Sequence, residues 1–310
     1  MRAFLFPGQG TQRVGMGTYL RERYPQLIEP LWQEADEILG YSLTRLCEEG
    51  PAEELRHMTV TQPAVFLCSY TALVAARAHG AEPDVVAGHS LGEYSALAAA
   101  DVLTWQEVLQ LVHRRGQLMA KVQNEVDGKM AAVIGLTVEQ VEEICEEVRA
   151  ATGEVVEVAN HNEPLQVVVS GQSAAIDLLV DHVTMLTPAR GSVLRIGGPA
   201  HSSLMESVSG DFVEHLRRFR FSPPKAMLIS GSTAVRYENE EEIVRQLGDQ
   251  LVHQVRWVDV MAELKRLGVS QTWELGPGKV LSGFVQRSLP QVRTYRANDL
   301  SSFEAGVAGW

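Results

Sequence analysis

The chain of 310 residues has only three cysteines, Cys47, Cys68 and Cys145, and they lie far apart in the sequence. No pair has the spacing of zinc ligands, and so few distant cysteines do not form a disulfide framework. Basic residues are also scarce, with 27 Lys plus Arg against 39 Asp plus Glu and a net charge of −12. Proteins that bind nucleic acids show a basic excess or stripe, so we expect no nucleic-acid partner.

Long apolar runs are missing as well. The longest stretch lies around Ala96–Leu103, is interrupted by Asp101, and is much shorter than the ~20 residues of a membrane-spanning helix. The amino terminus, Met1–Phe6, runs into a Pro-Gly turn without the apolar region of a signal peptide. We therefore expect a cytoplasmic protein with no membrane partner. The apolar fraction of 45% and the charged fraction of 21% are those of a globular chain.

The order of the predicted elements indicates an α/β fold. Arg2–Phe6 and Pro83–Gly88 are short apolar runs ended by Pro or Gly, as in buried strands. Leu91–Ala100 follows the second strand and is rich in the helix formers Ala and Leu. Strand, tight turn and helix in this order predict a largely parallel sheet. The other elements expected in this part are helices over Tyr19–Leu39 and Gln62–His79 and strands over Ala226–Ser230 and Thr272–Leu275.

Between Gly128 and Ile196 the pattern changes to that of a different fold. Six elements follow one another in the order βαββαβ, which is the ferredoxin-like plan. They are strands at Met130–Ile134, Val155–Ala159, Gln166–Val169 and Val193–Ile196, helices at Val138–Ala151 and Ala174–Met185, and a turn at Asn160–Pro164. We predict a small subdomain of residues 128–196, inserted into a large α/β catalytic domain of residues 1–127 and 197–310.

Gly88-His89-Ser90-Leu91-Gly92 is the strongest catalytic signal in the chain. It is a G-x-S-x-G sequence between a predicted strand and a predicted helix, the setting in which a nucleophilic serine stands on a strained turn. The backbone N–H of Leu91 then points from a helix N-terminus at the developing oxyanion. The alternative is an ordinary Gly-rich turn, of the kind that binds phosphate.

A serine nucleophile needs a base, and His201 is the best candidate because Gly, Pro and Ser residues place it on a loop. His89, next to Ser90, would project away from it across the turn. Gln9 lies in a Gly-Gln-Gly loop after the first strand, where ligands bind in parallel sheets, and its N–H could be a second oxyanion donor. Arg115 is followed by Gly in a predicted helix, and its planar fork suits a carboxylate. Taken singly, His201 is also compatible with a solvated histidine, the loop of Gln9 with a plain turn, and Arg115 with a surface arginine.

Together these features resemble the malonyl-CoA:acyl-carrier-protein transacylases and the acyltransferase domains of polyketide synthases. The resemblance covers essentially the whole chain. Its motifs, in order, are Phe6-Pro7-Gly8-Gln9-Gly10, Thr61-Gln62-Pro63-Ala64, Gly88-His89-Ser90-Leu91-Gly92-Glu93-Tyr94, Arg115-Gly116 with Met119, Asn160-His161-Asn162, His201-Ser202-Ser203-Leu204-Met205 and Glu274-Leu275-Gly276-Pro277-Gly278. The resemblance implies an α/β-hydrolase-like large domain with a mostly parallel sheet and a ferredoxin-like insert.

The resemblance also implies a role for each matching residue. Ser90 would be the acylated nucleophile and His201 its general base. The remaining roles are backbone oxyanion donors at Gln9 and Leu91, a carboxylate clamp at Arg115, cleft residues of the insert at Asn160 and Asn162, and a backbone carbonyl near His253, in the stretch Gln250–Trp257, that orients the catalytic histidine.

Three positions depart from the family pattern. His253-Gln254 stands where the family usually has Asn or Ser followed by Pro, although a carbonyl does not depend on the side chain. Ser230-Gly231 stands where the family has Ser-Asn. Ala200 precedes the catalytic histidine where malonyl-selective members often carry Phe, and the smaller side chain leaves room beside the acyl α-carbon. Leu91, by contrast, is typical of malonyl enzymes. We therefore expect malonyl or a 2-substituted malonyl group, such as methylmalonyl or ethylmalonyl, to be transferred.

The implied reaction is ping-pong transfer of the acyl group from coenzyme A to the phosphopantetheine thiol of an acyl carrier protein. It needs no metal and no redox cofactor, its partners are acyl-CoA and the carrier protein, and the chain is expected to act in trans in polyketide or fatty-acid synthesis. Three alternatives are an acyl-carrier-protein hydrolase of related fold, against which Arg115 argues, an α/β-hydrolase esterase, for which the HGGG-type loop is missing, and a non-catalytic docking module. The oligomeric state is left open, with a monomer as the default.

Overall fold

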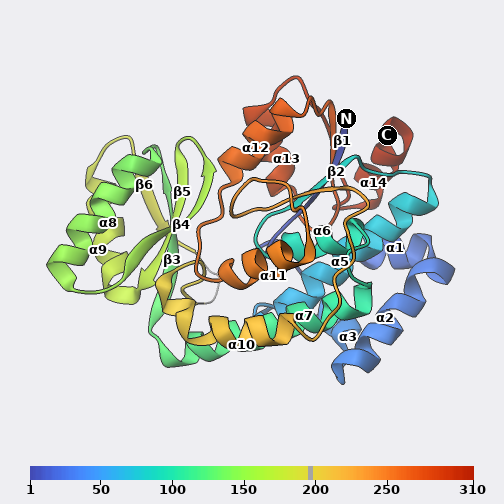
Figure 1. The fold of residues 1–310 in the computed structure, drawn as a ribbon, viewed down its shortest axis with the longest axis horizontal. Coiled ribbons are helices and arrows are strands. Elements are labelled where there is room, and N and C mark those ends of the chain that lie inside the picture. Colours follow the sequence, from blue (N-terminus) through green and yellow to red (C-terminus); the bar gives the residue numbers. More distant parts are fainter. Residues whose placement is uncertain (195–197) are drawn as a thin grey trace.

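A five-stranded parallel sheet lies at the centre of the larger part of the molecule in the computed structural model, which describes residues 1–194 and 198–310 (Figure 1). Its strands, in spatial order, are β7 (Met227–Ile229), β2 (Val85–Gly88), β1 (Arg2–Phe6), β8 (Gln271–Glu274) and β9 (Arg293–Arg296). Parallel strands are covered on both faces and read as continuous apolar runs. In β1, Phe4 and Phe6 pack into one apolar core. Ala3 and Leu5 pack into a second core on the opposite face.

Helices cover both faces of this sheet. They are α1 (Thr18–Arg23), α2 (Pro25–Leu39), α3 (Leu43–Glu49), α4 (Ala52–Leu55), α5 (Met58–Ala78), α6 (Gly92–Ala99), α7 (Trp105–Glu125), α10 (Glu206–Leu216), α11 (Glu240–Asp249), α12 (Trp257–Arg266), α13 (Val280–Ser288) and α14 (Leu300–Gly309), with a short 3-10 helix, η1, at Ser203–Met205. Helices α5, α6 and α7 contribute to the larger core, and α12 and α13 contribute to the other. The sheet is therefore an internal layer between two groups of helices.

Helix α5 is long and apolar enough, by length and composition alone, to cross a membrane. Most of its apolar part is nevertheless buried inside the molecule, with Val65, Phe66 and Leu67 fully buried. This is the usual position of a core helix in a globular fold, so the composition of α5 is explained by packing.

The predicted insert forms a separate antiparallel sheet, seen beside the large domain in Figure 1. Its elements are β3 (Gly128–Ile134), α8 (Val138–Thr152), β4 (Val156–Glu163), β5 (Gln166–Gln172), α9 (Ser173–Met185) and β6 (Arg190–Val193), with spatial strand order β4-β5-β3-β6. The two helices share an apolar core with the sheet, including Ile144 from α8 and Ile176 from α9. The predicted α/β fold with a ferredoxin-like βαββαβ subdomain is confirmed.

The predicted turn at Asn160–Pro164 was placed too early, because β4 continues through Glu163. Polar residues stay extended here because β5 pairs with β4 as far as Glu163 and the backbone of Val255 pairs with the outer edge of β4. Val255 donates its N–H to the Ala159 carbonyl at 2.9 Å, and its own carbonyl accepts the N–H of His161 at 2.8 Å. The insert is thereby joined to the large domain through backbone hydrogen bonds.

Two other predicted elements differ from the structure. The expected helix over Tyr19–Leu39 is divided into α1 and α2 at Tyr24, because Pro25 begins the second helix and has no N–H to continue the first. The strand predicted at Val193–Ile196 is β6, which ends at Val193. Residue 196, together with the predicted domain boundary between 196 and 197, lies outside the described residues, so the division into 1–127, 128–196 and 197–310 stays our proposal.

Candidate active site

The G-x-S-x-G sequence forms the strained turn that it predicts, between β2 and α6. Ser90 has a φ of +52°, a left-handed conformation that is costly for a residue with a side chain. A Cβ on Gly88 would lie 2.0 Å from the carbonyl carbon of Gly92, and a Cβ on Gly92 would lie 2.0 Å from the carbonyl oxygen of Phe6. Both glycines are therefore required by close backbone contacts, which hold the serine at the carboxyl edge of the sheet.

His201 lies directly against this serine, although 111 positions separate them in the chain. Its Nε2 is 2.7 Å from Ser90 Oγ. Its Nδ1 is 2.9 Å from the carbonyl oxygen of Gln250 and 3.1 Å from that of His253. Two carbonyl acceptors place the proton on Nδ1, which leaves Nε2 free to accept the serine proton. The His253 carbonyl is thus where the resemblance implies it, while Gln250 supplies a second and shorter contact.

The environment of His201 favours the neutral ring. Burial lowers its pKa to about 3, and the positive charge of Arg115 acts in the same direction. The two backbone carbonyls oppose this shift by accepting a hydrogen bond from the ring. At neutral pH the ring is therefore in the form that can take a proton from Ser90.

Arg115 of α7 is fully buried beside the same serine. Its Nη1 donates to Gln62 Oε1 at 3.0 Å, and its Nη2 donates to Gln250 Oε1 at 3.2 Å and to Ser90 Oγ at 3.3 Å. All of these acceptors are neutral, and within the described residues Nε has no hydrogen-bond partner. Burial lowers the pKa of the guanidinium. A buried cation whose neighbours are all neutral is suited to bind an anionic group next to the nucleophile.

The glycine after Arg115 lies at a close contact between two helices. A Cβ on Gly116 would lie 2.6 Å from the carbonyl oxygen of Met58, so α7 approaches the start of α5 closely at this point. Arg115 stands next to this close helix contact and is fully buried, so the arginine lies inside as the sequence leads us to expect.

The two predicted oxyanion donors are available. Leu91 is buried at the N-terminus of α6, and among the described residues neither its N–H nor that of Gln9 donates a hydrogen bond. The loop that carries Gln9 packs against the turn of the nucleophile, because a Cβ on Gly8 would lie 2.7 Å from the His89 carbonyl oxygen. The N–H of Leu91 at a helix N-terminus and the N–H of Gln9 in the loop after β1 are therefore free to donate, as an oxyanion hole requires.

A cavity of about 440 Å³ lies between the large domain and the insert. Its walls are the loop of residues 7–12, part of α13, and strands of the insert; the lining side chains include Arg56, His89, Asn160, Asn162, Val168 and Phe284. Asn162 Oδ1 is 2.8 Å from His89 Nε2, so the two domains also meet through side chains. Asn160 and Asn162 thus lie on the insert side of the cleft, as the resemblance implies. The described lining contains neither Ser90 nor Ala200, which is buried next to His201.

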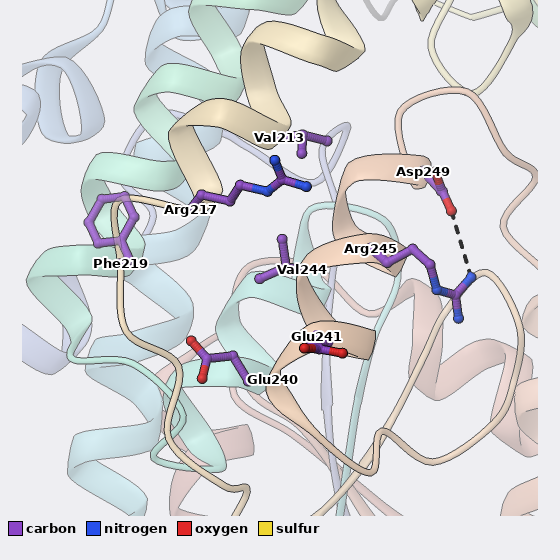
Figure 2. Close-up of a pocket in the computed structure, with 8 residues that line it drawn as sticks. All are labelled: Val213, Arg217, Phe219, Glu240, Glu241, Val244, Arg245 and Asp249. Atoms are coloured by element: carbon purple, nitrogen blue, oxygen red, sulfur yellow. Dashed lines mark ion pairs between the residues drawn. The ribbon is translucent and has the colours of Figure 1, made fainter.

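A larger cavity, of about 730 Å³, lies between α10 and α11 (Figure 2). Figure 2 shows Arg217 and Arg245 among acidic side chains, and Arg245 pairs with Asp249 at 3.9 Å. Glu240 and Glu241 line the same cavity. Among the described residues its lining contains no serine, cysteine or histidine, so it offers neither a hydroxyl or thiol nucleophile nor a histidine base.

Sequence reasoning gave no role to three buried residues of this site. Gln62 and Gln250 accept hydrogen bonds from Arg115, and Glu93 accepts one from Gln250 Nε2 at 2.5 Å. Gln62 and Glu93 lie inside the motifs of the resemblance, so the presence of a polar residue in each motif could have indicated that it belongs to the site. Gln250 had no local signal, because its contacts with Ser90 and Glu93 span about half the chain.

The Ser230-Gly231 departure also has a structural explanation. The Gly231 N–H donates to Glu93 Oε1 at 3.1 Å. A Cβ on Gly231 would lie 2.9 Å from the Gly88 carbonyl oxygen. Glycine therefore lets this backbone reach the turn of the nucleophile and the buried carboxylate behind it.

Comparison with known proteins gives consistent results. Residues 3–272 match the acyl transferase domain family. The chain is 40% identical over 294 residues, covering 93% of this chain and 96% of the other, to the polyketide biosynthesis malonyl CoA-acyl carrier protein transacylase of Bacillus subtilis. It is 35% identical, with 98% of each chain covered, to the malonyl CoA-acyl carrier protein transacylase of Escherichia coli K12.

Two solved structures are similar over nearly their whole length. One is an acyl carrier protein S-malonyltransferase from Vibrio cholerae, with a TM-score of 0.91, 35% identity, and coverage of 98% of this chain and 99% of that one. The other is a malonyl-transacylase solved in complex with its type II polyketide synthase acyl-carrier protein, with a TM-score of 0.95, 33% identity, and coverage of 100% and 99%.

Proposed function

Because the chain belongs to the acyl transferase family that includes the malonyl CoA-acyl carrier protein transacylases, we propose that it transfers malonyl or a 2-substituted malonyl group from coenzyme A to an acyl carrier protein. The observation that carries the proposal is the fully buried Arg115, whose guanidinium donates only to neutral acceptors and reaches Ser90 Oγ at 3.3 Å. A carboxylate on the acyl group would supply the missing anion at this position.

The proposed mechanism uses Ser90 and His201 twice. Nε2 of His201 takes the hydroxyl proton as Ser90 Oγ attacks the thioester carbonyl, and the N–H groups of Gln9 and Leu91 donate to the oxyanion. The C–S bond then breaks, and His201 gives this proton to the departing sulfur, so that coenzyme A leaves as the thiol and His201 is neutral again. In the second half the phosphopantetheine thiol gives its proton to His201 and attacks the acyl-serine. Ser90 regains the proton as it leaves. No step requires a metal or a redox cofactor.

Arg115 would select the acyl group as well as hold it. A planar guanidinium binds a carboxylate through two parallel hydrogen bonds, which acetyl and other monocarboxylic groups lack. A buried guanidinium that faces a methyl group keeps its desolvation cost without compensation, so those substrates would load more slowly. Ala200, buried before His201, would leave room for a 2-substituent at the acyl α-carbon.

An acyl carrier protein is the proposed second substrate, acting with this chain in trans. One of the similar structures is a transacylase in complex with its acyl-carrier protein, which supports a partner of this class. We also propose a cytoplasmic location and a monomer.

Intact-mass measurement after incubation with acyl-CoA, without carrier protein, tests the proposal. We expect a gain of one malonyl group from malonyl-CoA, a much slower gain from acetyl-CoA, and no gain in Ser90→Ala. Ser95→Ala is the matched control, because it removes a different buried hydroxyl, in α6, and this variant should still be acylated. A mass gain that persists in Ser90→Ala would exclude this serine, and equal loading from both donors would exclude the carboxylate clamp. In a second step, carrier protein is added to the acylated enzyme; release of the acyl group by water as fast as transfer to the carrier would favour the hydrolase.

A further inference from the structure

Behind the nucleophile lies a buried acid that the proposed mechanism does not use. Glu93 follows the G-x-S-x-G motif and is fully buried. Its Oε1 accepts hydrogen bonds from the Tyr237 hydroxyl at 2.5 Å and the Gly231 N–H at 3.1 Å, and its Oε2 accepts one from Gln250 Nε2 at 2.5 Å. Burial raises the pKa of Glu93 above its usual value, and these donors offset that rise in part because each stabilises the ionised carboxylate.

The side-chain amide of Gln250 joins this acid to the arginine. Its Nε2 donates to Glu93 and, at 3.2 Å, to the Ser90 carbonyl oxygen, while its Oε1 accepts from Arg115 Nη2 at 3.2 Å. An amide has donors at one end and acceptors at the other. Because the donor end must face the carboxylate, the acceptor end must face the guanidinium.

We propose that Glu93 is a positioning residue: through the Gln250 amide it orients and stabilises the guanidinium of Arg115, which it leaves free to bind the carboxylate of the acyl group. This inference rests on the proposed function, because it assigns Arg115 to that carboxylate. It extends the proposed site by a residue that touches neither the acyl group nor the reacting atoms.

A negative charge that acts on Arg115 through an intervening amide meets two requirements that conflict at a binding site. It compensates the buried positive charge, and it leaves room for the substrate carboxylate. A buried cation without any compensating charge is costly, and the negative charge of Glu93 acts to raise the pKa of Arg115 against the effect of burial. A carboxylate in direct contact with Arg115 would instead occupy the place of the substrate carboxylate. An interposed amide transmits polarisation, since hydrogen bonds in a chain strengthen one another, and keeps that place open.

Glu93→Gln tests the proposal because it should make the side-chain amide of Gln250 rotate by about half a turn. The new side chain can still accept from Tyr237, but its NH₂ group would face the NH₂ group of Gln250. Gln250 must then turn and present a donor to Arg115, which loses an acceptor. We expect kcat/KM for malonyl loading to fall about tenfold to a hundredfold, the value of one hydrogen bond to a charged group, while acetyl loading changes little.

The double variant Glu93→Gln/Gln250→Glu separates positioning from folding. The exchanged pair restores the hydrogen bond between positions 93 and 250 and the acceptor for Arg115, and the Ser90 carbonyl oxygen alone loses the donor that Gln250 gives it, so the thermal midpoint should recover in part relative to Glu93→Gln. The acid now contacts Arg115 directly, so malonyl selectivity should remain lost. Recovery of both stability and malonyl selectivity in the double variant would overturn the proposal. If Glu93→Gln does not fold, Tyr237→Phe removes one donor from the acid and should lower the malonyl-to-acetyl ratio in the same direction.

Glu274→Gln is the matched control for a buried carboxylate. Glu274 is also buried, and it accepts the N–H groups of Leu281 and Ser282 at the start of α13. This variant should lower stability and leave the malonyl-to-acetyl ratio unchanged. A wild-type protein that does not prefer malonyl would refute the proposed function itself. A wild-type preference that Glu93→Gln keeps intact would refute only the role of Glu93.

Discussion

The rate of self-acylation should be almost independent of pH between about pH 7 and pH 5. A histidine with the ordinary pKa of about 6.5 is only about 3% neutral at pH 5, so a base of that kind would lose roughly 25-fold of its rate over this range. Burial and the charge of Arg115 lower the pKa of His201 to about 3. The ring is then almost completely neutral at pH 5, and the available base should hardly change.

The assay is the initial rate of malonyl loading at subsaturating malonyl-CoA, followed by quenched intact mass. This rate reports kcat/KM, whose pH dependence reflects the groups of the free enzyme. Arg115→Met, assayed with acetyl-CoA, should move any inflection upward, because the second cause of the low pKa is removed while burial remains. A wild-type profile that falls with a midpoint near pH 6.5 would refute the buried neutral base.

Four further outcomes follow from the same geometry. Arg115→Lys should retain only part of the malonyl preference in competition assays, because an ammonium cannot form the bidentate pair. Ala200→Phe should lower the ratio of methylmalonyl to malonyl loading about tenfold or more, while malonyl loading stays within a few-fold. Gly88→Ala should fail to give folded protein by circular dichroism, since its Cβ would lie 2.0 Å from the Gly92 carbonyl carbon. Stability should fall from about pH 6 to pH 4 by up to ~1.4 kcal/mol per unit more than in His201→Gln, because the unfolded histidine binds a proton that the folded one rejects.

Local patterns were sufficient for much of the fold. β1 is apolar and fully buried beyond its first residue, and the elements of the insert follow the predicted order. β9 could not be found in the same way, because its sequence Arg-Thr-Tyr-Arg at the edge of the sheet is not an apolar run. The end of β4 differs from the prediction because its polar residues pair with β5 as far as Glu163, and Val255, which pairs with the other edge at Asn160, is distant in sequence.

In the active site, too, the features that depend on neighbouring residues could be predicted and those that depend on distant residues could not. The strained turn at Ser90 could be predicted because strand, glycines and helix are contiguous. An inward position of Arg115 could be predicted because the glycine that indicates it is the next residue in the sequence. The link from Glu93 through Gln250 could not, because the residues that it joins are 157 positions apart and no spacing rule relates them. Polar networks of this kind are set by tertiary packing, which a single sequence does not display.

The segment between α11 and α12 has a mechanical consequence. At one end the carbonyls of Gln250 and His253 hold the imidazole of His201, and at the other end Val255 extends the outer strand of the insert. Displacing the insert relative to the large domain must therefore break two backbone hydrogen bonds or pull the carbonyls with it. A partner that binds to the insert and displaces it would therefore act on the same short segment whose carbonyls fix the proton on His201 Nδ1. Binding at the insert and proton transfer at Ser90 are linked through this segment.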